Sequence, residues 1–343
     1  MTIVPHRRAF DQNRLGRLGF GCSTLGNLYR PMRDADAEAT VRAALDAGIA
    51  YMDVAPHYGF GLAEKRLGAA LAQADPDERI IVSTKVGRRL DPVAPGTDLS
   101  QSRQAFVSPE PFESVFDYSY DAVMRSWEDS LRRLRRERID ILYVHDIGRY
   151  AHGDDHPRLF RELMDGGYRA LRELRDGGVV GAIGLGVNEW QVCEEALGAG
   201  DFDMMLLAGR YTLLEQEALD SFLPLCAARD VQVVIGGPYN SGILAHGVKG
   251  PGPFHYEYQP ASPETVARVA AIEAVCDDHH VPLAAAALQF PLAHPQVASV
   301  IPGMNSAARV KQAVGQVAHP IPAAFWADMR SAGLIRADAP TPA

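Results

Sequence analysis

Eight short apolar runs, each followed by a segment with apolar residues at helical spacing, constrain the fold of this 343-residue chain most strongly. The expected strands are residues 17–21, 49–54, 80–86, 139–145, 179–186, 203–207, 231–236 and 297–302. The expected helices are residues 36–47, 62–73, 119–135, 159–176, 189–198, 215–229, 263–279 with 283–292, and 306–315. The strand runs are continuously apolar, which indicates that both faces of the sheet are covered. Eight such units predict a closed (β/α)8 TIM barrel, with residues 1–343 as a single domain.

An open, doubly wound sheet is the alternative arrangement for alternating strands and helices. Its phosphate-binding turn needs three glycines that open a helix directly after a strand. The candidate pairs Gly19 with Gly21 and Gly184 with Gly186 lack the third glycine and the following helix. The closed barrel is therefore the preferred interpretation.

The balance of charge limits the kinds of partner. The net charge of −9 argues against a nucleic-acid or anionic membrane surface, so we expect a small-molecule substrate and a monomer or small homo-oligomer. The densest basic patch, Arg132 to Arg138, has the pattern of a solvated helix face. No apolar stretch reaches the roughly 20 residues of a membrane span and the amino-terminal residues do not resemble a signal peptide, so a cytoplasmic location is expected.

The cysteine pattern predicts neither disulfides nor a structural metal. Cys22, Cys193, Cys226 and Cys276 are far apart and form no CxxC motif, so buried free thiols are expected. The run Asp277 to His280 resembles a metal cluster but ends a helical pattern, so we interpret it as a solvated helix terminus.

Three connections are too long to be simple turns. They are residues 87–117 after the third strand, 148–157 after the fourth and 237–262 after the seventh. All three follow the carboxyl ends of strands, where TIM barrels keep their active sites. We expect them to form the walls of a substrate pocket.

Four polar residues stand at or just past the ends of predicted strands: Asp53, Tyr58, Lys85 and His145. Each alone has an ordinary structural interpretation, such as a turn cap, a rim aromatic, a surface lysine or a satisfied histidine. Together, on one face of a barrel, they suit proton transfer. A tyrosine pKa of about 10 is too high for a base at neutral pH, but an adjacent ammonium favours the phenolate. Lys85, held in place by Asp53, can supply that ammonium to Tyr58.

The segments GFGCSTLGN, GIAYMDVAPHYGFGLAEKRLG, STKVG, RIDILYVHD and SVIPG resemble the aldo/keto reductase superfamily over nearly the whole chain. Within it, LGNLYR, DYSYDAV, VHDIGR, LLAGRYTLLEQ and GGPYNSGILA are similar to the branch of NAD(P)-dependent aldose 1-dehydrogenases, which includes L-fucose (D-threo-aldose) dehydrogenases and a pyridoxal 4-dehydrogenase. The resemblance implies a nicotinamide cofactor and assigns His145 the role of orienting the substrate oxygen.

The nicotinamide contacts implied by the resemblance are only partly present. Of the family's Ser-Asn pair after the fifth strand, only Asn188 carries over. Ala208 and Gly236 stand where the family has a glutamine and a ring-stacking tyrosine. The nearby tyrosines that could replace these contacts are Tyr211 and Tyr239.

The adenosine phosphate loop implied by the resemblance follows the eighth strand. A helix amino end suits a phosphate there, because its free N–H groups and its dipole favour negative charge. Gly303 replaces a lysine that NADP-preferring members use, whereas Arg309 keeps the arginine, so NAD or dual specificity is expected. The full set of expected cofactor contacts is Gly21, Asn188, Gly237, Ser241, Pro302, Gly303, Arg309 and Gln312.

The leading hypothesis is an oxidoreductase that converts the anomeric hydroxyl of an aldose such as L-fucose, or another lactol, to a lactone, with Tyr58 as the acid/base. The residues expected to contact the substrate are Tyr29, His57, His152 and Tyr239. Three alternatives stay open: a pyridoxal 4-dehydrogenase acting on the hemiacetal, an NADPH-dependent carbonyl reductase, and a nucleotide-binding regulatory barrel without activity.

Overall fold

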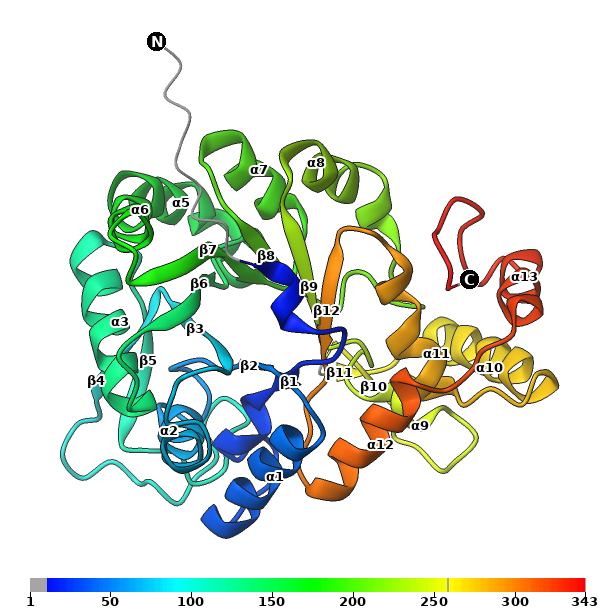
Figure 1. Ribbon diagram of the computed structural model, residues 1–343, viewed down its shortest axis with the longest axis horizontal. Helices are drawn as coiled ribbons and strands as arrows, with labels where there is room; N and C mark the ends of the chain where they lie inside the picture. The colour runs from blue at the N-terminus through cyan, green and yellow to red at the C-terminus, as the bar shows by residue number, and fades with distance from the viewer. Residues whose placement is uncertain (1–10, 258, 343) are drawn as a thin grey trace.

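A parallel sheet of eight strands closes into a barrel in the computed structural model, which describes residues 11–257 and 259–342 (Figure 1). The strands are, in their order around the sheet, β1 (Phe20–Gly21), β2 (Tyr51–Asp53), β3 (Ile81–Val86), β6 (Ile139–His145), β7 (Val180–Val187), β8 (Met204–Ala208), β9 (Gln232–Gly236) and β12 (Val297–Ile301). The first and last strands meet, because Gly19 N donates to Val300 O at 2.9 Å and Gly21 N to Pro302 O at 3.1 Å. The predicted TIM barrel is confirmed.

Helices pack around the outside of this sheet (Figure 1). They are α1 (Asp34–Asp46), α2 (Leu62–Ala74), α3 (Tyr120–Leu134), α6 (Tyr168–Asp176), α7 (Gln191–Ala199), α8 (Phe222–Arg229), α11 (Leu283–Gln289) and α12 (Ala307–Val317), with α10 (Pro263–Asp278) and α13 (Ala323–Ser331) further out. Helix α5 (His156–Glu162) continues through a π turn (Leu163–Gly167) into α6, so the predicted helix 159–176 starts earlier. Helix α8 starts later than expected, which leaves Pro224 in its first turn, where no backbone donor is needed.

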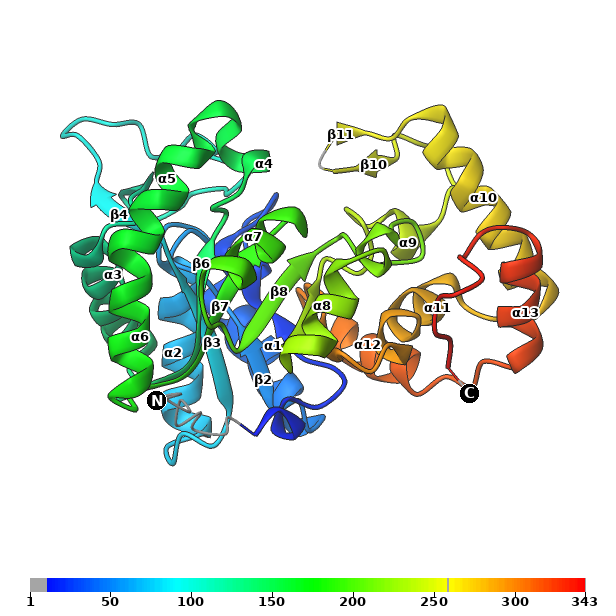
Figure 2. The same ribbon diagram turned by 90° about the horizontal axis from the view of Figure 1, so that it is seen from above.

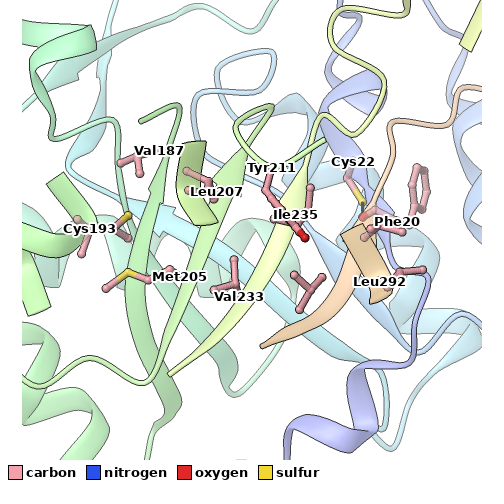
Figure 3. Packing of buried hydrophobic residues seen from close by; sticks show 14 of the residues in the cluster. Phe20, Cys22, Val187, Cys193, Met205, Leu207, Tyr211, Val233, Ile235 and Leu292 are labelled. Carbon is pink, nitrogen blue, oxygen red and sulfur yellow. Dashed lines mark hydrogen bonds between the residues drawn. The ribbon is translucent and has the colours of Figure 1, made fainter. Parts of the chain in front are cut away.

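Side chains alternate between the two faces of each strand. On β8, Met205 and Leu207 belong to the large cluster between sheet and helices (Figure 3). Met204 and Leu206 point the other way and belong to a second cluster inside the barrel. The second cluster includes Tyr51 and Tyr143, which are fully buried. Because the barrel interior is filled, the site must lie at an end of the barrel.

The three long connections all lie at the carboxyl end of the barrel and contain short elements (Figure 2). Residues 87–117 form the antiparallel pair β4 (Arg88–Pro92) and β5 (Phe112–Phe116). Residues 237–262 contain α9 (Ile243–His246), β10 (His255–Tyr256) and β11 (Gln259–Pro260). The connection after β6 contains α4 (Arg149–His152) and a 3-10 turn (Gly153–Asp155).

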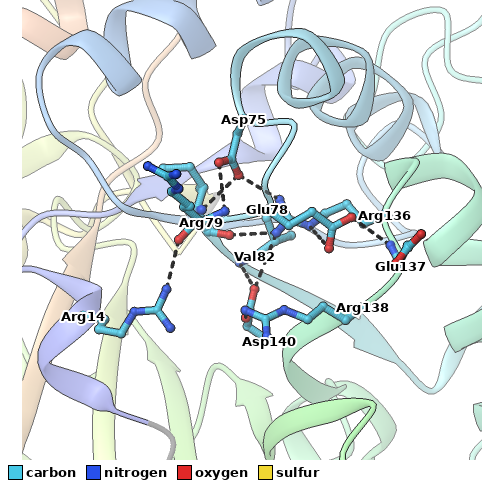
Figure 4. A network of polar contacts seen from close by, with 10 residues as sticks. Arg14, Asp75, Glu78, Arg79, Val82, Arg136, Glu137, Arg138 and Asp140 are labelled. Carbon is cyan, nitrogen blue, oxygen red and sulfur yellow. Dashed lines mark hydrogen bonds and ion pairs between the residues drawn. The ribbon is translucent and has the colours of Figure 1, made fainter.

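The opposite, amino end of the barrel holds a polar network that the sequence analysis missed (Figure 4). Helix α3 ends at Leu134, and Arg135 follows in the left-handed conformation with φ of 54°. The chain therefore turns inward, and Arg136 is only 7% exposed, donating to Ile80 O at 3.0 Å and to Asp75 Oδ2 at 3.4 Å. The interpretation of Arg132 to Arg138 as one solvated helix face is thus wrong for Arg136, although Arg132 is exposed.

Two smaller expectations concern cysteines and the end of α10. All four cysteines are buried free thiols, as predicted. At the surface, Asp277 pairs with Lys249 and His279 with Asp328. Between residues 11 and 342, leaving out residue 258, no helix is long and apolar enough to cross a membrane.

Candidate active site

The four predicted catalytic residues line one cavity of about 600 Å³ at the carboxyl end of the barrel. Asp53 ends β2, Lys85 lies in β3 and His145 ends β6, while Tyr58 follows β2 in a turn. The parallel register places neighbouring strand ends side by side, so residues far apart in sequence converge.

The Lys85 ammonium lies at the centre of the cluster and is buried. Its Nζ donates to Asp53 Oδ2 at 2.7 Å, to Val54 O at 2.9 Å and to Tyr58 Oη at 3.2 Å. These contacts use all three donors of the ammonium, which fixes its position against the phenol. The nitrogen also lies 4.8 Å from the centre of the Tyr58 ring.

Burial and charge act in opposite directions on these groups. Burial alone would lower the pKa of Lys85, but Asp53 and Tyr58 outweigh burial and raise it, so the ammonium stays charged. Burial raises the pKa of Tyr58, and Lys85 only partly offsets that effect. Burial likewise raises the pKa of Asp53 against the opposing charge of Lys85. Lys85 acts on the pKa of Tyr58 in the expected direction, but burial of the phenol has the larger effect.

Two hydroxyl groups joined by a hydrogen bond hold the second carboxylate oxygen of Asp53. Ser83 Oγ donates to Asp53 Oδ1 at 2.6 Å, and Tyr51 Oη lies 2.9 Å from Ser83 Oγ. Both residues are buried inside the barrel, on β3 and β2. With one oxygen on Ser83 and the other on Lys85, the carboxylate cannot rotate without losing a hydrogen bond, so it positions the ammonium.

The turn that carries Tyr58 is held by close backbone packing. A Cβ on Gly26 would lie 2.6 Å from the carbonyl carbon of Tyr58, and one on Gly59 would lie 2.5 Å from Gly26 O. Gly59 also has φ of 64°, so both positions require glycine. Arg66 on α2 donates to Leu25 O at 2.7 Å and to Met32 O at 2.6 Å, which ties the loop containing Gly26 to the helix.

Two buried imidazoles, those of His57 and His145, line the same cavity as Lys85. Burial, with Lys85 and Arg88 nearby, lowers the pKa of His145 well below its ordinary value, and burial lowers that of His57 to about 2. The two rings lie 5.9 Å apart, centre to centre. Nδ1 of each ring is buried and has no hydrogen-bond partner among the described residues. Both residues line the cavity, although these two nitrogens are themselves buried.

Tyr118 supports the backbone that carries His145. Its hydroxyl lies 3.0 Å from the carbonyl oxygen of His145 and 2.8 Å from Nε2 of His152. His152 also packs edge-on against Phe116, with ring centres 4.4 Å apart. His152 is not among the residues that line the cavity, so this geometry gives it a supporting position instead of the predicted substrate contact.

An ion pair in the cavity wall was not identified from the sequence. Arg88 Nη1 donates to Asp146 Oδ2 at 2.8 Å, and both residues line the cavity. The same Oδ2 lies 3.6 Å from Nε2 of His145. The sequence offered one indication of this pair, which is the closeness of both residues to predicted catalytic residues. Arg88 follows Lys85 by three residues, and Asp146 follows His145 directly.

The other half of the rim is formed by the ends of β7, β8, β9, β12 and β1, and small residues line much of it. They include Gly21, Gly186, Ala208, Gly236, Gly237 and Gly303. A Cβ on Gly236 would lie 3.2 Å from Cδ2 of Leu206, so a larger side chain there would take up space in the slot. This slot belongs to the same cavity as Tyr58 and Lys85, and Asn188 also lines that cavity.

The tyrosines considered as substitutes for the missing nicotinamide contacts do not reach the cavity. Tyr211 is fully buried against Phe290, with ring centres 5.4 Å apart. Tyr239 donates from its hydroxyl to Gln316 Oε1 at 2.8 Å, which directs it to α12. Neither lines the cavity, so the predicted substrate contact of Tyr239 is also not supported.

The predicted site residues, taken together, fall into two groups: those that line the cavity and those that lie around it. The predicted residues that line the cavity are Gly21, Tyr29, Asp53, His57, Tyr58, Lys85, His145, Asn188, Gly237 and Gly303. Ser241 lies in a small adjoining recess with Arg210, whose Nε donates to Asn188 O at 2.7 Å. Pro302 accepts the hydrogen bond that closes the barrel. At the start of α12, Arg309 Nη1 donates to Gln312 Oε1 at 2.7 Å on the exposed surface.

A closed parallel barrel with a buried Asp-Lys-Tyr cluster and a histidine in one cavity at its carboxyl end defines a barrel enzyme with its candidate site at that end. The sequence profile of the aldo/keto reductase family matches residues 17–333. The chain belongs to the aldo/keto reductase family and is an oxidoreductase.

Similar proteins support this assignment over nearly the whole chain. The chain is 45% identical to pyridoxal 4-dehydrogenase of Microbacterium luteolum over 347 aligned positions, covering 96% of this chain and 99% of that protein. It is 40% identical to D-threo-aldose 1-dehydrogenase of Pseudomonas sp over 330 positions, covering 95% of each. A solved aldo-keto reductase from Bacillus halodurans in its holo form has a TM-score of 0.70 and 26% identity, with 94% of this chain and 92% of that chain covered.

Proposed function

We propose that this enzyme oxidises the anomeric hydroxyl of an aldose, or of a similar lactol, to the lactone with NAD or NADP. The observation that carries the proposal is the contact between Lys85 Nζ and Tyr58 Oη at 3.2 Å inside a cavity with a polar wall and a small-residue slot. The dehydrogenases among the relatives act, by their names, on an aldose and on pyridoxal, which both form hemiacetals.

The reaction removes a proton from the hydroxyl oxygen and a hydride from the carbon that carries it. A bound nicotinamide supplies the hydride acceptor. Tyr58 takes the proton as the phenolate and becomes the neutral phenol, and Lys85 stabilises the phenolate before the transfer. Asp53 keeps Lys85 charged and in place. His145 is neutral, so it can donate one ring N–H to the substrate oxygen and fix the reacting carbon without adding charge.

The residues from Gly303 to the first turn of α12 support an expectation about the preference between the two cofactors. Gly303 offers no cation, whereas Arg309 lies on the first turn of a helix whose N-cap is Ser306. A 2′-phosphate would meet one arginine in place of the usual two cations. We therefore expect NAD to be used at least as well as NADP. The kcat/KM for NAD should exceed that for NADP by only a small factor.

The test is a panel in which NADH or NADPH formation is followed with L-fucose, L-galactose and pyridoxal as substrates. Reduction of a simple aldehyde by NADPH is measured in parallel. Faster oxidation of an aldose than of pyridoxal supports the proposal. Aldehyde reduction that exceeds every oxidation rate would replace it with a carbonyl reductase.

Pyridoxal is the second candidate substrate because the relative named for it has 45% identity. Its cyclic hemiacetal presents the same hydroxyl to Tyr58, and its flat ring could pack against Phe106, which lies at the cavity wall. A kcat/KM for pyridoxal above that for every aldose in the panel would favour this candidate.

A further inference from the structure

The cavity contains a charged pair that the proton-transfer chemistry does not use. Arg88 and Asp146 line the wall beside His145, and their side chains are only 11% and 20% exposed. The chemistry proposed for Tyr58, Lys85, Asp53 and His145 needs neither group. A buried ion pair contributes little net stability to a fold, because the cost of desolvating both charges offsets most of their attraction.

Arg88 is held in place from several sides. Its Nε donates to Ser114 Oγ at 3.2 Å and its Nη2 to Gln104 Oε1 at 2.9 Å, both from the 87–117 connection. The guanidinium lies 4.6 Å from the centre of the Phe116 ring. The arginine therefore presents a fixed cation to Asp146.

Asp146 is fixed by its backbone. Its φ of 51° is unusual for a residue other than glycine, and such strain often accompanies functional sites. Its N–H donates to Gly186 O at 3.1 Å, and its carbonyl oxygen lies 3.1 Å from the Tyr118 hydroxyl. The side chain is thus directed to the cavity wall, where Oδ2 accepts from Arg88. Within residues 11–257 and 259–342, Oδ1 has no hydrogen-bond donor.

The position of Asp146 relative to His145 defines which substrate atom it can reach. Oδ2 lies 3.6 Å from Nε2 of His145, the residue whose ring is proposed above to bind the reacting oxygen. Oxygens on adjacent carbons lie about one hydrogen-bond length apart, roughly 2.8 Å. A group on the carbon next to the reacting one therefore falls within reach of this carboxylate.

We propose that Asp146, positioned by Arg88, binds the hydroxyl on the carbon adjacent to the reacting hemiacetal carbon, and so selects aldoses over lactols without that hydroxyl. The proposal rests on the lactol oxidation proposed above. An ionised carboxylate only accepts hydrogen bonds, so it distinguishes a hydroxyl donor from the ring oxygen on the other side of the same carbon. The aromatic rings of Phe106 and Phe116, which line the same cavity, suit the apolar face of a sugar.

The test compares kcat/KM for L-fucose and 2-deoxy-L-fucose in the wild-type enzyme and in Asp146→Asn. A hydrogen bond to a charged acceptor predicts a wild-type preference for L-fucose of roughly 10- to 100-fold. Asp146→Asn should bring this ratio close to one, mainly by slowing oxidation of L-fucose. Asp91→Asn is the matched control, because Asp91 accepts from Arg89 Nε at 2.9 Å on β4, outside the cavity, and should leave the ratio unchanged.

Each contrary outcome has a separate meaning. If the wild-type enzyme has nearly equal kcat/KM values for the two sugars, the subsite is overturned and lactol oxidation is not. This outcome is measured on the wild type alone, so it does not depend on whether a variant folds. An equal loss for both sugars in Asp146→Asn would show that Asp146 acts only through His145, which also overturns the subsite. A high ratio that survives Asp146→Asn removes the assignment to Asp146. A wild-type enzyme that oxidises neither sugar refutes the aldose substrate itself, and the subsite with it.

Discussion

Both ends of the barrel hold a buried group of charged side chains, but the two groups are bonded differently. At the amino end, Asp75 accepts hydrogen bonds from the N–H groups of Arg79 and Ile80 at 2.8 and 2.9 Å, and Asp140 accepts from Val82 N at 3.0 Å (Figure 4). These carboxylates bind backbone that is itself part of the loops and strand starts they hold together.

At the carboxyl end, the cluster lines the cavity and has fewer hydrogen bonds to backbone. Among the described residues, only Lys85 donates to the Tyr58 oxygen. Nδ1 of His57 and Nδ1 of His145 have no partner there. The comparison teaches that charged side chains hold backbone segments together at the amino end, whereas at the carboxyl end they line a cavity that can admit a ligand.

Lys85→Met should give the largest effect, because it removes the cation at the centre of the catalytic cluster. The kcat for lactol oxidation should fall by about 10²- to 10⁴-fold. The free energy of unfolding should also fall, by about 3 kcal/mol, because Asp53 is left buried without its partner. Steady-state kinetics and urea unfolding measure the two effects.

The double variant Asp53→Asn with Lys85→Met serves as its control. Removing both charges should recover most of the stability but none of the activity. Activity that returned with stability would mean that this cluster is structural, like the one at the other end.

Arg136→Met tests the amino end. It leaves Asp75 without a buried cation, so the free energy of unfolding should fall by about 3 kcal/mol, while kcat of the folded enzyme stays unchanged. Circular dichroism during chemical unfolding measures the free energy of unfolding. Steady-state kinetics at 15 °C, where the variant is folded, measures kcat. A large drop in kcat with little loss of stability would break the proposed division between the two ends.

The response of stability to pH should reveal the neutral imidazoles at the carboxyl end. The pKa of His57 is lowered to about 2 from its ordinary 6.5, so the unfolded chain binds a proton that the folded protein does not. Stability is therefore full above about pH 6.5 and declines as the pH falls. When the pH falls from 6.5 to 5, the free energy of unfolding should decrease in both proteins. The decrease should be about 2 kcal/mol smaller for His57→Gln than for the wild type, as measured by urea unfolding. Parallel curves would show that His57 titrates normally.

Arg132→Ala should have the smallest effect. Arg132 is exposed and pairs only with its helix neighbours Glu128 and Asp129. The free energy of unfolding should change by less than about 0.5 kcal/mol, with unchanged kcat. A change as large as that of Arg136→Met would mean that exposure does not separate the two arginines.

The sequence predicted the barrel and the meeting of Asp53, Tyr58, Lys85 and His145, because apolar periodicity locates strands and parallel strand ends share one rim. It did not predict partners that depend on how loops fold. Arg88 reaches Asp146 through the β4 and β5 pair, and this contact joins residues 58 positions apart.

Side-chain direction limited the other predictions for the same reason. His152 and Tyr239 are in the expected connections, but Tyr118 and Gln316 hold them away from the cavity wall. Arg136 was assigned to a solvated face because helical spacing continued past Leu134, whereas the left-handed Arg135 ends the helix there. No local pattern in the sequence reports such tertiary contacts.

The central claim is that Tyr58 transfers the proton at the carboxyl end of the barrel. The most direct measurement is kcat of Tyr58→Phe for lactol oxidation, with the melting temperature and the Kd for NAD⁺ measured on the same protein. The account predicts a fall in kcat of at least about 100-fold with unchanged melting temperature and Kd. A kcat equal to that of the wild type would contradict it.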